Sequence, residues 1–167
     1  MYMQHMRDGE TIAAQARRMA LEVRRSCLGV RIGRLNRLVA RRFEHALRPL
    51  GLSLAQVEVL GALVLIQDPA RPADLVNLLA VERSTISRNL ALLEKRGYVT
   101  TTKTSPTGRS QRVTVTAEGQ SVLAHAEQAW AEAQRVVADQ LGAHALPTLD
   151  AWLEKLASSD EEGYPSP

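Results

Sequence analysis

The spacing of apolar residues changes period once along this chain, and that change limits the folds open to it. Apolar residues recur every three or four positions up to Gly97, as on helices, and this spacing resumes at Ala117. Between these points "VTTTK" and "RSQRVTVT" alternate apolar and polar residues around the turn "TSPTG", which is typical of a β-hairpin. We therefore expect a mainly α fold with one small hairpin.

Proline, glycine and capping residues divide the helical spacing into segments. A first long helix is expected to end at residues 49–51, and Ser53 is expected to cap a second helix that reaches about Ile66. Pro72 suits the first turn of a short third helix, and residues 82–96 form a fourth. The first helix carries the stripe Leu28, Ile32, Leu35, Val39, Phe43, Ala46 and Leu50, and the second is expected to bury Leu54, Val57, Leu60, Ala62 and Leu65.

Helical spacing also flanks this central part. The N-terminal stretch "TIAAQARRMALEV" is predicted to be helical, and two helices are expected after the hairpin, the last carrying Leu149, Trp152, Leu153 and Leu156. Three short helices with tight turns and a trailing two-stranded ribbon are the elements of a winged helix-turn-helix. That fold class is our prediction for the centre of the chain.

The basic charge is regional, although the net charge is only +3. Residues 17–48 hold ten arginines against two glutamates, and residues 81–112 hold seven bases against two acids. Residues 99–167 carry five bases and nine acids. A basic centre beside an acidic C-terminal part is typical of a surface that faces a polyanion, although solvated helix faces have the same appearance.

Several classes of protein are disfavoured by the residues present. One cysteine, Cys27, allows no disulfide within the chain and favours a reducing, cytoplasmic setting. Neither a signal peptide nor a membrane span is expected. The chain has no phosphate-binding glycine loop, no paired histidines four residues apart and no nucleophile elbow, so neither an enzyme nor a metal site is predicted. No cofactor is expected.

The fourth helix has the outward face of a recognition helix. Ile86, Leu90 and Leu93 share one side of a helical wheel, which leaves small or basic residues opposite them near the N-terminal end. Hydroxyl groups there can bond phosphates or bases, and Arg88 can donate two hydrogen bonds to a guanine. The residues assigned to DNA binding on this helix are Arg83, Ser84, Thr85, Ser87, Arg88 and Lys95.

The hairpin adds a second set of candidates. Arg109 follows Gly108 at the tip, where an arginine can enter a narrow minor groove. Lys103 and Arg112 flank it and are placed to meet the DNA backbone. Taken alone, a basic hairpin tip is also compatible with a solvated turn. The wing residues assigned to DNA binding are Lys103, Thr107, Arg109 and Arg112.

These segments resemble the MarR family of transcriptional regulators over about residues 28–157. The likeness lies in "LRPLGLSLAQVEVL", "ADLVNLLAVERSTISRNLALLEKRGYV" and "GRSQRVTVTAEGQ". It implies a homodimer with intertwined first, fifth and sixth helices that binds double-stranded DNA at a pseudo-palindromic operator. It further implies a repressor released by a small ligand, often aromatic or phenolic. Arg88 matches the family's base-contacting arginine and Arg109 its wing arginine.

The chain departs from the family pattern at two turns. Thr107 stands where the family often has an aspartate that orients the wing arginine, and Ala80 stands where the turn before the recognition helix often has glycine. Because alanine tolerates a positive φ poorly, we expect that turn to take a different shape.

The resulting organisation has four parts. Residues 1–50 form an N-terminal extension and first dimerisation helix, 51–116 the winged helix-turn-helix lobe, 117–157 the C-terminal dimerisation helices and 158–167 a polar tail. A lobe of this size has little left to cover the apolar residues of the last helices, and a second copy would bury them. It would also space two recognition helices by about one DNA turn, roughly 34–36 Å.

Three questions stay open. Cys27 lies beside Arg24 and Arg25, which favour a thiolate, so it is either a peroxide sensor or an inert packing group. The basic helices are compatible with a module that binds an acidic protein partner, and the salt dependence of duplex binding separates this from DNA recognition. The arginines of the first helix, Arg31, Arg34, Arg37, Arg41 and Arg48, either pair with the acidic helices of a second copy or are solvated.

Overall fold

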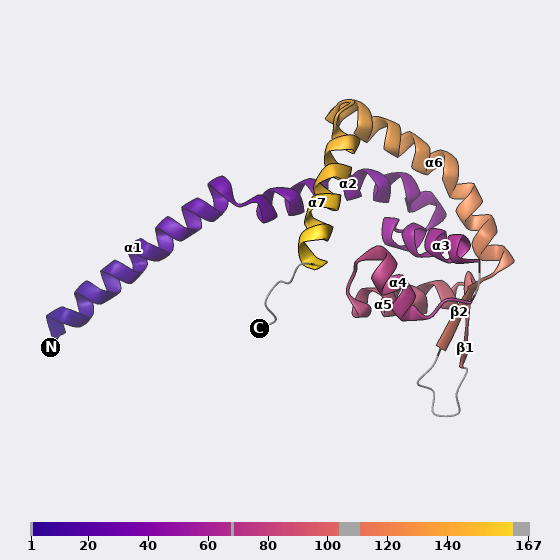
Figure 1. Ribbon diagram of the computed structural model, residues 1–167, viewed down its shortest axis with the longest axis horizontal. Coiled ribbons are helices and arrows are strands. Elements are labelled where there is room, and N and C mark those ends of the chain that lie inside the picture. Colours follow the sequence, from indigo (N-terminus) through magenta and orange to yellow (C-terminus); the bar gives the residue numbers. More distant parts are fainter. Residues whose placement is uncertain (1, 68, 104–110, 162–167) are drawn as a thin grey trace. The chain divides into compact units, whose positions relative to one another are not determined.

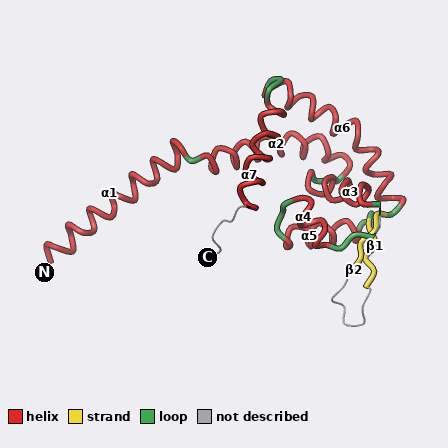
Figure 2. Tube along the Cα trace, viewed as in Figure 1, coloured by secondary structure: helices red, strands yellow, loops and turns green. Residues whose placement is uncertain are grey.

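The computed structural model describes residues 2–67, 69–103 and 111–161, with side chains from residue 11 to residue 158. The chain divides into two compact units, Met1–Arg41 and Arg42–Pro167. The described part is helical apart from short turns, one two-stranded antiparallel sheet and one isolated bridge (Figure 2). The predicted fold class, mainly α with a small hairpin, is therefore confirmed.

The first unit holds the N-terminal helices. Helix α1 spans Tyr2–Ser26, and α2 begins at Leu28 and ends at Leu47 in the second unit. A single 3-10 turn, η1 (Arg48–Leu50), follows, and Gly51 ends it with a φ of 67°. The predicted helical N-terminal stretch and the predicted end at residues 49–51 are both confirmed.

Three helices form the centre of the second unit: α3 (Leu54–Ile66), α4 (Pro72–Leu79) and α5 (Arg83–Lys95). Ser53 caps α3 as predicted, because its hydroxyl accepts a hydrogen bond from the Gln56 amide at 3.2 Å. The Gln56 side chain in turn accepts one from the Ser53 amide at 3.1 Å. This reciprocal capping box gives hydrogen-bond partners to two amides at the start of the helix.

The predicted buried face of α3 is partly wrong. Leu65 is 80% exposed, whereas Val59, Leu60 and Leu63 enter the core. Leu54 and Val57 are only half-buried. The reason is that α3 is apolar on nearly every side, so a helical period cannot identify the face that packs inward.

A small sheet closes the lobe beside these helices (Figure 1). Strands β1 (Val99–Lys103) and β2 (Gln111–Val115) pair antiparallel, with Val99 opposite Val115. A bridge between Ala70 and Val113, with hydrogen bonds of 2.9 and 2.8 Å, joins the segment before α4 to β2. The fully buried side chains of this lobe include Leu47, Leu60, Leu75, Ile86, Leu93, Val99 and Val113.

Helices α6 (Ala117–Leu141) and α7 (Ala145–Glu161) complete the second unit. Helix α6 packs against α3. The ring centroids of Trp130 on α6 and Phe43 on α2 lie 6.3 Å apart. The polar tail is expected to start at residue 158, but residues 158–161 are still part of α7. The preceding leucine- and alanine-rich turns have already nucleated this helix, and adding further residues to an existing helix costs little.

Candidate nucleic-acid interface

Helix α5 presents the two faces that its sequence predicts. Ile86, Leu90 and Leu93 are buried against the lobe. All six residues assigned to DNA binding on this helix lie on the surface: Arg83, Ser84, Thr85, Ser87, Arg88 and Lys95. The predicted outward face is therefore exposed and presents polar and basic side chains.

The first turn of α5 has no side-chain cap. Glu82 occupies the N-cap position, and in the described part of the chain no side chain bonds the first amides of the helix. Ser84 and Thr85 are the second and third residues of the helix, so neither hydroxyl is the N-cap. Open amides at a helix N-terminus attract phosphate oxygens. This end of α5 is thus chemically suited to an anionic backbone.

The turn between α4 and α5 keeps a left-handed residue although glycine is missing. Ala80 has φ 49° and ψ 45°, and its amide bonds the carbonyl of Val76. The expectation that this turn takes a different shape is therefore wrong. The hydrogen bond and the packing of both helices hold the alanine in a conformation that costs it about 1–2 kcal/mol.

The wing is described up to its tip. Lys103 ends β1 on the surface, and Arg112 lies half-buried on β2. Thr107 and Arg109 lie outside the described residues, so their assignment as wing contacts stays a prediction.

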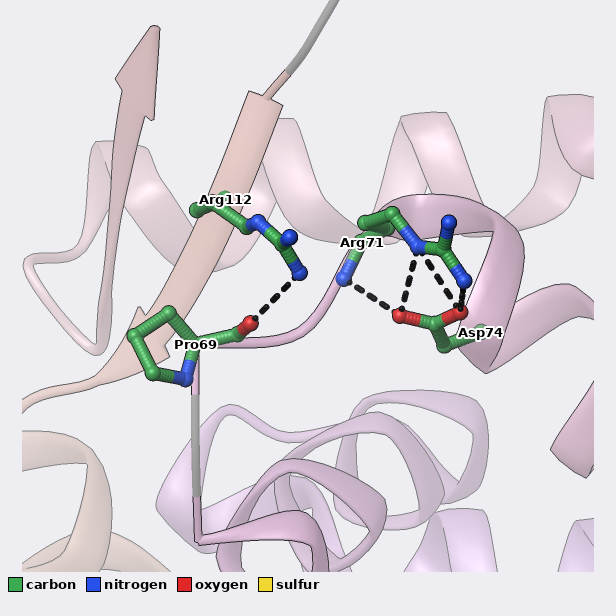
Figure 3. Close-up of polar contacts among 4 residues, drawn as sticks. All are labelled: Pro69, Arg71, Asp74 and Arg112. Atoms are coloured by element: carbon green, nitrogen blue, oxygen red, sulfur yellow. Dashed lines mark hydrogen bonds and ion pairs between the residues drawn. The ribbon is translucent and has the colours of Figure 1, made fainter. Parts of the chain in front are cut away.

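The base of the wing holds a polar cluster that sequence reasoning missed in part (Figure 3). Arg112 donates from Nη1 to the carbonyl oxygen of Pro69 at 3.2 Å. Two residues further along the same segment, Arg71 pairs with Asp74, with Nη2 to Oδ1 at 2.7 Å and Nε to Oδ1 at 3.1 Å. Asp74 also accepts from the Arg71 amide at 2.8 Å, which caps α4. In the sequence "RPAD", Asp74 follows Arg71 by three residues, which is the spacing of a capping box. This spacing could have predicted the pairing of the two residues.

The charges of this cluster stabilise the ionised forms of Asp74 and Arg71. Hydrogen bonds from Arg71 hold the pKa of the Asp74 carboxyl below its ordinary value, and the charges of Arg71 and Arg112 lower it further. The same pairing raises the pKa of Arg71. Asp74 is therefore ionised at neutral pH, and the cluster of two arginines and one carboxylate carries a net positive charge.

Two contacts tie the outward-facing helix to the rest of the lobe. Arg96, just after α5, donates from Nη1 to the carbonyl oxygen of Gly51. Glu94 accepts from the amide of Thr101 on β1 at 3.1 Å. The guanidinium of Arg96 therefore bonds the turn before α3. These bonds hold α5 and the wing in one orientation.

Cys27 lies half-buried at the break between α1 and α2. Its amide bonds the carbonyl of Val23 at 3.4 Å, and its carbonyl accepts from Arg31 at 3.2 Å. Nearby, Arg31 donates from Nη2 to the carbonyl of Arg25. These contacts leave its assignment as a sensor an untested prediction.

A groove of about 710 Å³ opens between the end of α3, β2 and the first half of α6. Its apolar lining includes Leu63, Val64, Val115 and Leu123, and Gln67 and Glu127 add polar groups. Gln67 has a left-handed φ of 63° where α3 ends. The groove thus lies between the lobe that carries α5 and a predicted dimerisation helix.

Among the described residues no cluster of three or more metal-binding side chains occurs. Within the same residues no single helix is long and apolar enough to cross a membrane; only the bent combination of Leu28–Leu50 with Leu54–Ile66 meets the length and composition criteria.

Together, a helix pair, an outward-facing third helix and a two-stranded ribbon with a third bridged segment define a winged helix-turn-helix protein. More particularly, residues 50–110 of the winged lobe match the model of the MarR family. The predicted resemblance is confirmed, and the family is one of transcriptional regulators rather than enzymes.

Solved structures agree with this placement. The Mycobacterium tuberculosis transcriptional regulator MosR is 25% identical, with a TM-score of 0.69 over 83% of this chain and 98% of its own. A mutant of Escherichia coli MarR complexed with operator DNA is 25% identical, with a TM-score of 0.69 over 81% and 97%. The repressor CouR, bound to a 23-mer DNA duplex, is 29% identical, with a TM-score of 0.61 over 80% and 92%. A search of curated protein sequences finds no match.

Proposed function

We propose that this chain is a transcriptional repressor that binds double-stranded DNA through α5 and the wing. The observation that carries the proposal is the outward face of α5, where six polar or basic side chains stand exposed opposite the buried Ile86, Leu90 and Leu93. A helix with such a face enters the major groove while the wing reaches the neighbouring backbone or minor groove. The DNA complexes of MosR, MarR and CouR support this mode of binding.

The proposed active form is a homodimer on a pseudo-palindromic operator. Helix α7 exposes Leu146, Trp152, Leu153 and Leu156, each by more than half of its side-chain surface. Several large apolar side chains exposed on one helix are typical of an association surface. A second copy would cover it and would supply the second recognition helix that an inverted repeat requires.

The proposed signal is a small aromatic or phenolic effector. The groove between α3, β2 and α6 supports this because its apolar lining suits a ring and its glutamines offer hydrogen bonds to a hydroxyl group. A ligand seated there would contact both β2 and α6. It could release DNA only by binding the DNA-free conformation more tightly than the DNA-bound one.

Duplex binding by the full-length protein tests the proposal. Fluorescence anisotropy with a labelled 30-base-pair duplex, across a series of salt concentrations, is expected to show a steep fall in affinity as salt rises. Light scattering during size exclusion is expected to give twice the chain mass. A folded protein that ignores duplex DNA at low salt would contradict the proposal and favour the module that binds an acidic protein.

The alternative of a peroxide-sensing repressor through Cys27 has its own test. If Cys27 is the sensor, peroxide releases the wild-type protein from DNA and leaves Cys27→Ser bound. If Cys27 is a packing group, peroxide changes the two proteins alike.

A further inference from the structure

The base of the wing brings two arginines from different segments to one place. Arg112 extends from β2, and Arg71 stands just before α4 on the segment that Ala70 bridges to Val113 of the same strand (Figure 3). The bridge fixes the two segments to each other by hydrogen bonds of 2.8 and 2.9 Å. The spacing of the two guanidinium groups therefore depends on backbone pairing rather than on a loop.

Arg71 is held in one orientation yet keeps donors for a ligand. Its Nε and one Nη2 hydrogen bond Asp74, whereas an arginine carries five N–H donors in a fixed planar arrangement. Figure 3 shows Nη1 of Arg71 turned away from Asp74. The side chain of Arg71 is 61% exposed. Asp74 thus acts as a positioning residue that leaves the Nη1 donors directed outward.

Arg112 is fixed in a similar way. Its Nη1 bonds the Pro69 carbonyl, and its charge acts on Asp74. The Asp74 carboxylate pairs with Arg71, and the carbonyl that Arg112 bonds is neutral, so one positive charge is left unbalanced. Fixed guanidinium donors bind phosphate well because little side-chain entropy is lost on contact.

We infer that Arg71 and Arg112 together bind a DNA backbone phosphate at the base of the wing, with Asp74 positioning Arg71. This rests on the proposed function, and it adds Arg71 to the interface that the sequence predicts. In a helix-turn-helix the first helix, here α4, crosses the DNA backbone while the second enters the groove. Arg71 stands at the N-terminal end of α4, where the helix dipole adds to its attraction for an anion.

Salt titration of duplex binding by the full-length protein tests this inference. The probe is a 30-base-pair duplex of random sequence, because a phosphate contact is independent of base sequence. Arg71→Gln and Arg112→Gln are each expected to lower the slope of log affinity against log salt by up to about 0.9, the value for one phosphate contact. The matched control is Arg135→Gln on α6, which removes an equally exposed arginine paired with Glu132 and Asp139 and is expected to leave the slope unchanged.

A conservative variant separates a phosphate contact from a structural role. Arg71→Lys keeps the positive charge but loses the forked pairing with Asp74, so it is expected to keep a slope near that of wild type. Slopes equal to wild type in both glutamine variants would overturn the inference while leaving the proposed function intact. An absence of salt-dependent duplex binding by the wild-type protein would overturn both. Thermal unfolding identifies any variant whose lobe has come apart, and the slope of the other glutamine variant then decides the inference.

Discussion

Gly119 lies directly against the carbonyl group of Tyr98. A Cβ atom placed on Gly119 would come within 2.1 Å of that oxygen and 2.9 Å of Cγ2 of Val115. The same junction is bonded by Thr116, whose hydroxyl donates to the Gly97 carbonyl at 2.6 Å and accepts from the Gly119 amide at 3.0 Å. The start of α6 is thus fitted to the turn between α5 and β1.

Gly119→Ala is expected to destabilise the protein by about 3 kcal/mol, because the clash is with backbone and cannot be relieved by a rotamer change. Gly61→Ala on α3 is the matched control, since a Cβ there meets nothing within 4 Å. A helical alanine should leave the second variant equal to or more stable than wild type, by up to about 1 kcal/mol. Urea unfolding measures both changes, and equal midpoints for the two variants would contradict the fitted junction.

Ala80→Gly is expected to stabilise the protein by about 1 kcal/mol. The alanine has φ 49°, a conformation in which glycine has no Cβ strain. The control Ala91→Gly, on the exposed face of α5, should act in the opposite direction by a similar amount because it weakens a helix interior. Thermal melts of both variants test the pair, and a loss of stability in Ala80→Gly would argue against the left-handed turn.

Ionised Asp74 is expected to stabilise the folded protein, so the free energy of unfolding should fall as the solution becomes acidic. Its folded-state pKa lies below the ordinary value of 3.8 because Arg71 bonds the carboxylate. The stabilisation is therefore present above the unfolded-state pKa and is lost as pH falls through the folded-state pKa. Asp74→Asn should be less stable than wild type at pH 7, and the difference should shrink as the pH falls below 4. Asp150→Asn, on the exposed surface of α7, is the control and should follow wild type.

Arg88→Ala is expected to cost about 1–3 kcal/mol of binding and to relax the preference at one base pair. The physical reason is the loss of a forked donor that reads a guanine edge in the major groove. Competition with duplexes mutated at single positions measures this, and Arg135→Ala is the control. An unchanged base preference in Arg88→Ala would remove Arg88 from the base-contacting group.

The sequence predicts best the features that local chemistry decides. The period of Ile86, Leu90 and Leu93 identifies the buried face of α5, and the spacing of Ser53 and Gln56 contains the cap of α3. It fails at Leu65, because a helix that is apolar all round gives no preferred direction.

Other features depend on contacts distant in sequence. Arg112 meets Pro69, and Arg96 meets Gly51, across more than 40 positions of the chain. No local pattern predicts such pairs. The left-handed turn at Ala80 is a related case, since surrounding structure overrides the preference of a single residue.

Selection of duplexes from a random DNA pool by the purified protein tests the central claim most directly. If α5 and the wing of two copies read DNA, sequencing of the retained fraction will show an enriched inverted repeat with half-sites about one helical turn apart. If the folded protein at low salt enriches no sequence, the assignment of α5 as a recognition helix is contradicted.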